Sequence, residues 1–525
     1  MTFFSDHITH KLGLDKFLVY SSAIKNRKQS AIINSFVGFI CLVIPIFIQF
    51  VSRRYFLEYL NVEYLGIYGT FTSLLTTLSL SELGIQTAVV YCLYKPLAEQ
   101  NYKQVNDLMN VLRVIYKWIG GLFILFPFLF LPFLGYVLKG TVLAYDVTLS
   151  FFIVSFTSAC SYFLAYKRCL IFADQKDYIS KVTDLGCNLF FAIAQIVSLV
   201  IFQSFLILNI IGLIGVIVSN SIIHLLCKRL YPFLRRSRFS KETFKEVWSY
   251  TKNIILLRLA AYVYGSTDNL VISSIVGTAW VGFLGNYSIL TTKLTSIANG
   301  MLIPIGPIIG NLLLEKDDKK NESILRVYTL VRLFIASVLL VPLFIVYEDL
   351  ISWWIGDKYV LPQIIKYLLL ADFFINIYYT ACCDFIGAAG LFNKDRNIGL
   401  IGATINIGLS VFLVFRLGVE GVLIGTVVSQ LFFWISRSMI LFKYCIKLGR
   451  KAFLSYWLRV ILHVAVLCGV LYVASYLYAM ISVSNLFYHI ILGAVSSVLL
   501  TAIIYVVVYY YSMELQYLRL NLIKK

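Results

Sequence analysis

Long apolar runs separated by short polar segments dominate this chain of 525 residues. Runs of ~20 apolar residues are long enough to cross a bilayer as helices. The pattern therefore predicts an all-α polytopic membrane protein with 14 transmembrane helices. We expect the spans at residues 31–51, 64–94, 114–138, 147–171, 180–203, 206–228, 251–275, 280–312, 325–347, 361–390, 398–416, 420–443, 456–479 and 486–511.

The apolar pattern occurs twice. The segment YLGIYGTFTSLLTT, with Gly66, aligns without a gap with WVGFLGNYSILTTK, with Gly282. Further matches follow in order along both halves: Leu112–Val114 with Leu325–Val327, Lys176–Asp177 with Lys394–Asp395, Asn188 with Asn406, and Gly215 and Ser219 with Gly425 and Ser429. An internal duplication of six helices is typical of transporters. Helices 13 and 14 lie outside it.

Composition supports the membrane assignment and charge fixes an orientation. The chain is 60% hydrophobic and only 14% charged, with a net charge of +19. Of its 45 Lys and Arg residues, most lie in loops on the same side of the membrane as the N-terminus. Few lie within the spans or in the loops on the other side of the membrane. Those in the opposite loops are Arg53, Arg54, Lys139, Lys358 and Arg416. By the positive-inside rule both termini are cytoplasmic, so the excess charge does not indicate a nucleic-acid partner.

This orientation gives a domain plan. Spans 1 and 7 both enter from the cytoplasm, so the two repeats are parallel and related by a pseudo-twofold axis along the membrane normal. We expect a cytoplasmic leader at 1–30, a first lobe at 31–228, a basic cytoplasmic linker at 229–250, a second lobe at 251–443, and helices 13 and 14 with a cytoplasmic tail at 444–525.

The residues offer no catalytic or cofactor site. The 10 Cys lie within or beside apolar runs without metal-binding spacing, and the five His do not cluster. We therefore expect neither a metal nor a cofactor. The chain has no phosphate-binding G-x-x-x-x-G-K-[ST] loop, so it does not hydrolyse ATP itself. The outward loops are short, which leaves no surface for an enzyme active site.

Three segments carry a resemblance to a known family. They are LGIYGTFTSLLTTLSLSELGIQTAVVYCLYKPLA at 65–98, FADQKDYI at 172–179 and TDNLVISSIVGTAWVGFLGNYSIL at 267–290. Together with the span count, they resemble the polysaccharide-transport family, the flippases of O-antigen and capsule repeat units, within the multidrug/oligosaccharidyl-lipid/polysaccharide exporter superfamily. The resemblance implies two lobes around a cationic cavity that opens alternately to each side and accepts an undecaprenyl-diphosphate-linked glycan. The first lobe departs from this picture because its spans hold few cations.

Lys293 is the strongest candidate for contact with the substrate diphosphate. It lies ~20 Å beyond Trp280 along a helix, near the membrane midplane. A charge at that depth requires a cavity or a partner, so the alternative is a structural ion pair. Arg258 is the second substrate-binding candidate. Glu82 lies at nearly the same depth, and the two would close a cytoplasmic gate or form a permanent pair within one lobe.

Other charged residues within spans suggest coupling or gating. Asp268 would hold a coupling proton or sodium ion, or would cap an unwound turn. Asp372 and Asp384 are similar candidates. We expect Arg332 and Lys366 to extend their charged groups to the membrane interfaces.

Pro304 and Pro307 interrupt the helical hydrogen bonds of span 8, which predicts a bend that serves as a hinge or only as packing.

The leading functional hypothesis is a flippase for lipid-linked oligosaccharides in the bacterial cytoplasmic membrane. Membrane lipid, a polysaccharide polymerase and a chain-length regulator are the expected partners. An ion-coupled exporter of drugs or lipids is the alternative within the superfamily, although twelve spans are usual there. A membrane polymerase or ligase is the alternative from another class, which the short outward loops disfavour.

Overall fold

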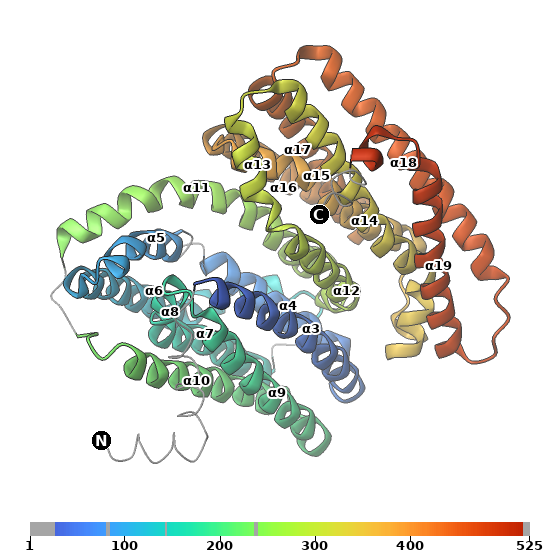
Figure 1. The fold of residues 1–525 in the computed structure, drawn as a ribbon. Helices are drawn as coiled ribbons and strands as arrows, with labels where there is room; N and C mark the ends of the chain where they lie inside the picture. The colour runs from blue at the N-terminus through green and yellow to red at the C-terminus, as the bar shows by residue number, and fades with distance from the viewer. Residues whose placement is uncertain (1–26, 80–83, 142–143, 236–239, 518–525) are drawn as a thin grey trace. The chain divides into compact units, whose positions relative to one another are not determined.

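The protein is built of helices joined by short loops (Figure 1), and no strand occurs among the described residues. The computed structural model describes residues 27–79, 84–141, 144–235 and 240–517, without the side chains of 27–36, 39, 42 and 253–264. A bilayer interior offers no water to backbone N–H and C=O groups, so an apolar chain satisfies them within helices. The prediction of an all-α membrane fold is confirmed.

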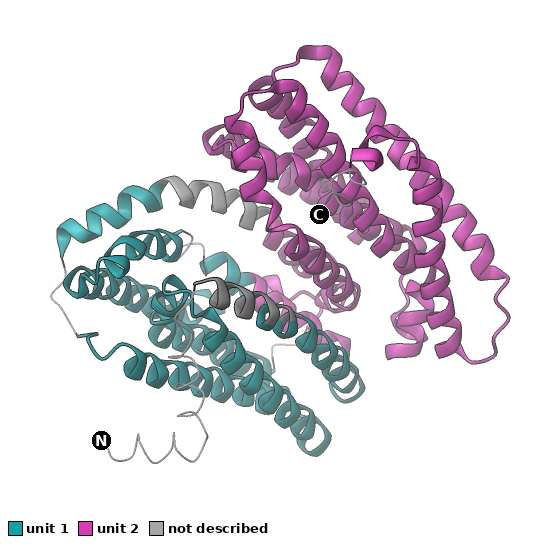
Figure 2. Cartoon of the chain, viewed as in Figure 1, with its two compact units in different colours: residues 1–61, 74–135, 142–259 teal, residues 62–73, 136–141, 260–525 magenta. Residues whose placement is uncertain are grey.

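The chain forms two compact units (Figure 2), of which the first contains residues 1–61, 74–135 and 142–259. Its helices are α3 (Arg27–Tyr59), α5 (Ile85–Ala98), α6 (Tyr102–Val137), α7 (Tyr145–Ala165), α8 (Arg168–Ala173), α9 (Asp177–Phe202) and α10 (Phe205–Leu230). Helix α3 packs against α9, and both α7 and α9 pack against α10. Close approach of α9 and α10 depends on Gly215, where a Cβ atom would lie 2.9 Å from the Phe191 ring.

The second unit contains residues 62–73, 136–141 and 260–525. Three described helices contribute residues to both units: α4 (Asn61–Leu78), α11 (Lys241–Val271) and α6, whose last residues, Tyr136 and Val137, belong to the second unit. The remaining helices are η2 (Ile272–Val276), α12 (Thr278–Leu302), α13 (Ile305–Leu314), α14 (Asp318–Ile355), η3 (Asp357–Tyr359), α15 (Gln363–Ala388), α16 (Phe392–Leu417), α17 (Val419–Ile440), η4 (Leu441–Ile446), α18 (Gly449–Ala479) and α19 (Leu486–Tyr509). Helices α15 and α16 pack against α17, while α14 packs against α15, α18 and α19.

The same local packing recurs in both units. In each, the helices of the fourth and fifth predicted spans of a repeat pack against the sixth. The glycine contact also recurs, because a Cβ atom on Gly425 of α17 would lie 2.7 Å from the Ser410 hydroxyl of α16. Small residues let helix backbones approach closely in membranes. These parallels support the duplication, which stays a prediction, as do the lobe boundaries at 31–228 and 251–443.

A reciprocal glycine contact joins α4 and α12 inside the second unit. A Cβ atom on Gly66 would lie 1.9 Å from the Thr278 carbonyl oxygen, and one on Gly282 would lie 2.2 Å from the Val62 carbonyl oxygen. Each added Cβ would also come within 3.1 Å of the other glycine's backbone nitrogen. These are the glycines that the duplication pairs, and self-complementary contacts of this kind are typical of a twofold relation.

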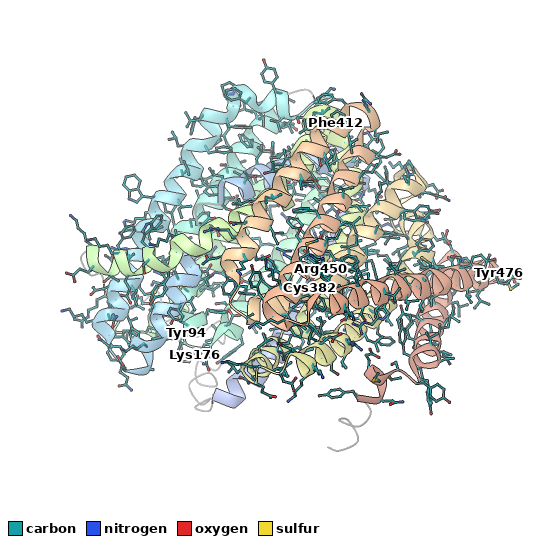
Figure 3. All side chains as sticks on the ribbon, turned by 90° about the horizontal axis from the view of Figure 1, so that it is seen from above. Tyr94, Lys176, Cys382, Phe412, Arg450 and Tyr476 are labelled. Atoms are coloured by element: carbon teal, nitrogen blue, oxygen red, sulfur yellow. The ribbon has the colours of Figure 1, made fainter. Side chains whose placement is uncertain are left out.

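Ten described helices are long and apolar enough to cross a membrane, or eleven if the bent pair α12 and α13 is one span. The protein is therefore a multi-pass membrane protein. Every predicted span falls on a helix or on consecutive helices. The spans at 31–51, 64–94 and 251–275 include or adjoin residues outside the described part, so the number fourteen stays a prediction. Helix α18 illustrates the lengths involved: Arg450 and Tyr476 lie near its two ends (Figure 3).

Candidate functional site

Helix α12 carries Lys293 beside a face of small and polar residues. Thr292, Ser296 and Gly300, spaced four residues apart, lie along this face, and Lys293 adjoins it. The hydroxyls bond within the helix: Thr292 Oγ1 donates to the Ser288 carbonyl at 2.5 Å, and Ser296 Oγ donates to that of Thr292 at 2.8 Å. Because the helix itself supplies these acceptors, the hydroxyls keep lone pairs available on this face.

Lys293 forms no hydrogen bond or ion pair among the described residues. The structural ion pair considered from the sequence is therefore absent from that part of the chain. An ammonium group at membrane depth without a carboxylate partner is expected to face water or a ligand, because exposure to lipid is costly. Lys293 is thus available to bind an anion, although its role in substrate binding stays a prediction.

The helix of the eighth span breaks some ten residues after Lys293. The axes of α12 and α13 differ by 47° across the break, and Pro304 immediately precedes α13. Proline lacks the backbone donor that would continue the α12 hydrogen bonds, so the break is located where the sequence predicts a bend. Pro307 lies one turn further on and is accommodated within α13. A hinge role for either proline stays a prediction.

Asp268 lies in a polar cluster in the interior of the second unit. Its Oδ2 atom accepts a 2.6 Å hydrogen bond from the Thr426 hydroxyl of α17. The same hydroxyl oxygen accepts from the Asn406 amide of α16 at 3.2 Å. Asp268 Oδ1 and Asn406 Oδ1 are buried and have no donor among the described residues. Helices α11, α16 and α17 therefore bring together oxygen atoms whose hydrogen-bonding capacity is unused.

Asp372 and Gln430 form a second carboxylate–amide pair. Gln430 Nε2 donates to Asp372 Oδ1 at 3.2 Å. Its Oε1 atom is buried and, within the described part of the chain, lacks a donor. Thr426, Ser429 and Gln430 occupy positions i, i+3 and i+4 of α17, so one helix face presents them together.

This oxygen-rich cluster suits a small monovalent cation. Buried acceptors without donors are unfavourable, and a proton or a hard cation satisfies them. Asp268 supplies the negative charge, while Asn406 and Thr426 supply neutral oxygen atoms. The donor set fits the coupling proton or sodium ion expected at Asp268. Asp372 would add a second carboxylate.

Asp384, the other coupling candidate, is the carboxylate partner of a buried arginine. Its Oδ2 atom accepts from Arg332 Nη2 and from the Tyr328 hydroxyl, each at 2.6 Å. The other terminal nitrogen, Arg332 Nη1, donates to the Ile377 carbonyl at 2.9 Å and to Asn299 Oδ1 at 3.1 Å, while Nε is buried without a partner among the described residues. This network favours a structural role for Asp384, and its gating or coupling role stays a prediction.

The expectation that Arg332 and Lys366 reach the membrane interfaces is wrong. Arg332 is 2% exposed and Lys366 is 7% exposed. Lys366 Nζ donates to Glu348 Oε1 at 2.5 Å. Both cations have carboxylate partners on neighbouring helices of the second unit, which stabilises them inside the protein and removes the need to reach water.

Two further candidates cannot be placed. Glu82 and the side chain of Arg258 lie outside the described residues. Their proposed gate and the phosphate contact of Arg258 therefore stay predictions.

One pair was not singled out from the sequence: Arg437 Nε donates to Asp395 Oδ1 at 2.6 Å and its Nη1 donates to the Tyr379 hydroxyl at 3.0 Å. Its only sequence signal was an arginine within a span.

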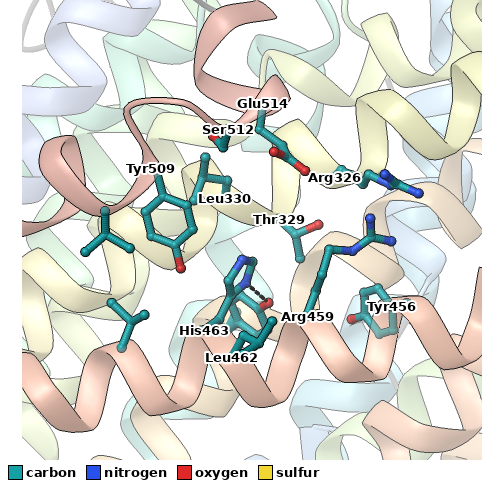
Figure 4. Close-up of a pocket in the computed structure, with 13 residues that line it drawn as sticks. Arg326, Thr329, Leu330, Tyr456, Arg459, Leu462, His463, Tyr509, Ser512 and Glu514 are labelled. Atoms are coloured by element: carbon teal, nitrogen blue, oxygen red, sulfur yellow. Dashed lines mark hydrogen bonds between the residues drawn. The ribbon is translucent and has the colours of Figure 1, made fainter.

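A cavity of about 340 Å³ lies between α14, α15, α18 and α19 (Figure 4). Arg326 and Arg459 both bind Glu322 Oε1, at 2.5 and 3.3 Å. His463 Nδ1 lies 2.7 Å from the Tyr378 hydroxyl. The charges around this cavity are largely matched, so it offers apolar volume rather than an unsatisfied charge.

Comparisons with known proteins identify the fold. No known family model matches the chain. It is 24% identical over 393 residues to the uncharacterized membrane protein MJ1375 of Methanocaldococcus jannaschii, a match that covers 71% of this chain and 88% of that protein. This identity is too low to show what the chain does.

Solved transporters share the fold. The lipid II flippase MurJ in an inward closed conformation superposes with a TM-score of 0.62 and 13% identity, covering 91% of this chain and 99% of MurJ. An inward-facing multidrug resistance MATE family transporter of the MOP superfamily gives 0.61 and 12%, covering 79% and 100%. The MATE multidrug transporter DinF-BH gives 0.55 and 15%, covering 82% and 97%. At these identities, the likeness shows that the chain has the fold of these transporters.

Proposed function

We propose that this protein is a flippase that moves undecaprenyl-diphosphate-linked oligosaccharide repeat units across the cytoplasmic membrane by alternating access, for assembly of a cell-surface polysaccharide. The observation that carries the proposal is Lys293, a cation in the eighth span without a hydrogen bond or ion pair among the described residues. A transported diphosphate supplies the missing negative charge. The adjoining face of Thr292 and Ser296 offers hydroxyls to the sugars.

A single ammonium suits a substrate that must also leave. Lysine binds phosphate as a point charge with three rotatable donors and does not impose the fixed bidentate geometry of arginine. The diphosphate can therefore dissociate from the Lys293 ammonium group and be hydrated by water at either membrane face. Arg258 would add a second cation on α11, with Glu82 acting as the gate. The likeness to the lipid II flippase MurJ supports a lipid-linked substrate.

The cluster around Asp268 provides a means of coupling. A proton or sodium ion there would neutralise the carboxylate and occupy the acceptor oxygens that lack donors. Because the cluster connects α11, α16 and α17, binding of the ion would change the packing between these helices. Loading and release of the cation would thereby bias one conformation of the second unit over another.

Reconstituted transport tests the proposal. Wild-type protein and Lys293→Ala are placed in vesicles containing a lipid-linked oligosaccharide, and its arrival in the opposite leaflet is followed with a lectin or glycosidase. We expect Lys293→Ala to lower the rate at least tenfold, while the yield of folded protein is unchanged because no described partner is lost. Lys319→Ala, which removes an exposed lysine from the start of α14, is the matched control. A normal rate in Lys293→Ala would refute the assigned role.

The acceptor cluster also suits the alternative, an ion-coupled exporter of drugs or amphipathic lipids. DinF-BH, with the same fold, is described as a MATE multidrug transporter. The same vesicles distinguish the two functions when a fluorescent cationic dye such as ethidium is supplied. Cation-driven accumulation of the dye without glycolipid movement would support the exporter, and glycolipid movement without dye accumulation would support the flippase. A polymerase or ligase would lengthen or transfer the glycan instead of moving it.

The proposed role includes a location and partners. Both termini would face the cytoplasm, and the product would pass to a polysaccharide polymerase and a chain-length regulator in the same membrane. Cysteines introduced at the exposed positions Gly140 and Ser484 should react with an impermeant thiol reagent in intact cells, and one at Lys319 should not. These variants require replacement of Cys468, which is exposed. Labelling at Lys319 alone would reverse the orientation.

A further inference from the structure

A second cationic site lies in the first unit, apart from α12 and its lysine. It is a cavity of about 420 Å³ where the ends of α6, α8 and α10 meet the turn at 231–235. Its charged lining consists of Arg113, Lys167, Lys228 and Arg235, with His224 beside them. No carboxylate occurs among the described residues that line it. A concave surface lined by one sign of charge concentrates ions of the opposite sign.

Lys167 is the least expected of these cations. It is 7% exposed, and its Nζ atom lies 3.0 Å from His224 Nε2. An ammonium group only donates, so Nε2 accepts and the neutral imidazole carries its proton on Nδ1. That Nδ1 atom is buried and has no acceptor in the described part of the chain. The Lys167–His224 contact therefore leaves both a buried positive charge and a buried donor unsatisfied.

Arg113 of α6, which also lines the cavity, has an unsatisfied donor too. Its Nη2 atom donates to Asn110 Oδ1 at 2.6 Å. Its Nε atom is buried without a partner among the described residues. Buried donors that lack acceptors are destabilising. Arg113, Lys167 and His224, which come from three elements (α6, the α7–α8 connection and α10), therefore place two cations and an imidazole around one cavity without a carboxylate among its described lining residues.

The next residue, Arg168, is a cation of the same unit that does have a carboxylate partner. Arg168 donates to Asp184 through both terminal nitrogens, at 2.5 and 2.8 Å, and through Nε to Asn220 Oδ1 at 3.0 Å. The fold thus supplies a carboxylate to Arg168 but, within the described part of the chain, none to Lys167. General attraction to lipid headgroups explains cations exposed at span ends, but not a lysine that is buried.

The cavity wall is held in place by its own hydrogen bonds. Asn106 Nδ2 donates to the Phe233 carbonyl at 3.1 Å, and the backbone N–H of Arg235 donates to Asn106 Oδ1 at 2.8 Å. Tyr231 donates to Asp174 Oδ2 at 2.8 Å. Burial and the nearby Asp174 carboxylate raise the pKa of Tyr231, so it remains a donor at neutral pH. These hydrogen bonds hold the turn at 231–235 in place, and with it Arg235 at the rim of the cavity.

We propose that this cavity binds a phosphate group. A phosphate supplies several acceptor oxygens and the negative charge that Lys167 and Arg113 lack, and charge-assisted hydrogen bonds are the strong ones. Lys228 and Arg235, both exposed, would complete the coordination from the rim. The phosphate belongs either to a soluble compound or to the headgroup of an anionic phospholipid, since the two share this chemistry. The site is separate from Lys293 and does not depend on the transport proposal.

Binding to the full-length protein tests the proposal in two arms. In detergent, inorganic phosphate and pyrophosphate are titrated, with binding measured by calorimetry and thermal unfolding, and with sulfate-free chloride of equal ionic strength as reference. In nanodiscs, phosphatidylglycerol is compared with phosphatidylcholine, with retained lipid identified by native mass spectrometry. Saturable binding in the first arm indicates a soluble ligand, and selective retention of phosphatidylglycerol indicates a lipid headgroup. Either result supports the phosphate site.

Matched variants locate the binding. Arg113→Gln with Lys167→Gln should lower affinity at least tenfold. Lys103→Gln with Lys117→Gln removes the same charge from exposed positions of the same α6 helix and should leave affinity unchanged. If the first pair fails to fold, Arg235→Glu changes only the exposed rim and should also abolish binding, because it supplies a competing carboxylate. No binding in either arm, or equal loss in the control pair, would overturn the proposal.

Discussion

Two clusters of buried polar groups, one in each unit, are unbalanced in opposite directions. In the second unit Asp268, Asn406 and Gln430 present oxygen acceptors without donors among the described residues. In the first unit Arg113 and His224 present nitrogen donors without acceptors, and Lys167 adds a buried charge. The first deficit calls for a cation and the second for an anion. The proposals above accordingly assign a cation to the cluster in the second unit and a phosphate to the cluster in the first.

Ion pairs elsewhere show that buried cations of this protein can have a carboxylate partner. Arg332 has Asp384, and Arg437 has Asp395 within 2.6 Å. Membrane helices can clearly place a carboxylate opposite a buried cation where the fold needs one. Unsatisfied groups elsewhere are more informative because unpaired buried polar groups are rare and unfavourable.

The largest effect is expected on breaking the central ion pair. Asp384→Ala leaves the Arg332 guanidinium buried without its carboxylate, so we expect a loss of ~3–5 kcal/mol in the free energy of unfolding. Thermal or denaturant unfolding in detergent measures it. The double variant Arg332→Met with Asp384→Leu removes both charges and should lose much less. A similar loss in both would mean that packing, not charge, stabilises this region.

A smaller effect is expected at the acceptor cluster. A bound cation should raise wild-type stability by ~2.7 kcal/mol at a hundred times its dissociation constant. Asp268→Asn removes the charge that attracts the cation, so this increase should disappear while the stability without added cation is maintained. Unfolding in sodium chloride is compared with unfolding in choline chloride, and a pH series tests for a proton. An unchanged response in Asp268→Asn would remove this residue from the coupling site.

The contact between Gly66 and Gly282 allows the contribution of helix packing in the second unit to be measured without a change in charge. Gly282→Ala places a methyl group against the Val62 carbonyl of α4, so we expect a loss of ~1–3 kcal/mol from overpacking. Gly300→Ala on the same helix meets nothing within 4 Å and should instead stabilise by ~0.5–1 kcal/mol through helix propensity. Equal effects at both positions would contradict the close helix crossing.

The smallest effect on stability is expected at an exposed ion pair. Lys95 and Glu99 lie 3.9 Å apart, near the end of α5, with side chains that are 82% and 55% exposed. Lys95→Ala should change stability by ~0.5 kcal/mol or less, since such pairs are screened by water. A loss comparable to that of Asp384→Ala would show that burial is not what distinguishes the paired charges.

Much of the fold could be predicted from apolar run length, because the bilayer leaves helices as the main solution. The position of the bend in the eighth span followed from Pro304. The partners of Asp268 did not follow, since helix periodicity does not reveal which neighbouring helix Thr426 faces. Asn406 drew attention only as a repeat match.

Tertiary burial explains why the expectation for Arg332 was wrong and why Lys167 was not singled out from the sequence. Arg332 was expected at an interface because a sequence shows that a cation lies in a span but not that a carboxylate lies opposite. Lys167 lies near the end of the span predicted at 147–171, and its sequence context does not indicate that it is buried. Only packing against α10 and the 231–235 turn distinguishes it from solvated lysines such as Lys103. Sequence indicates the depth of a charge along a helix, but not the side of the helix on which its neighbours lie.

The reciprocal contact of Gly66 and Gly282 also limits which substitutions these two positions can accept during evolution. A side chain gained at either position meets backbone carbonyl oxygen on the opposite helix. Every residue type carries the same carbonyl, so no second substitution there can make room. An ion pair such as Arg437–Asp395 can instead be exchanged in two steps for other matched residues. In a library of random variants selected for function, both glycines should tolerate fewer replacements than the residues of the Arg437–Asp395 pair.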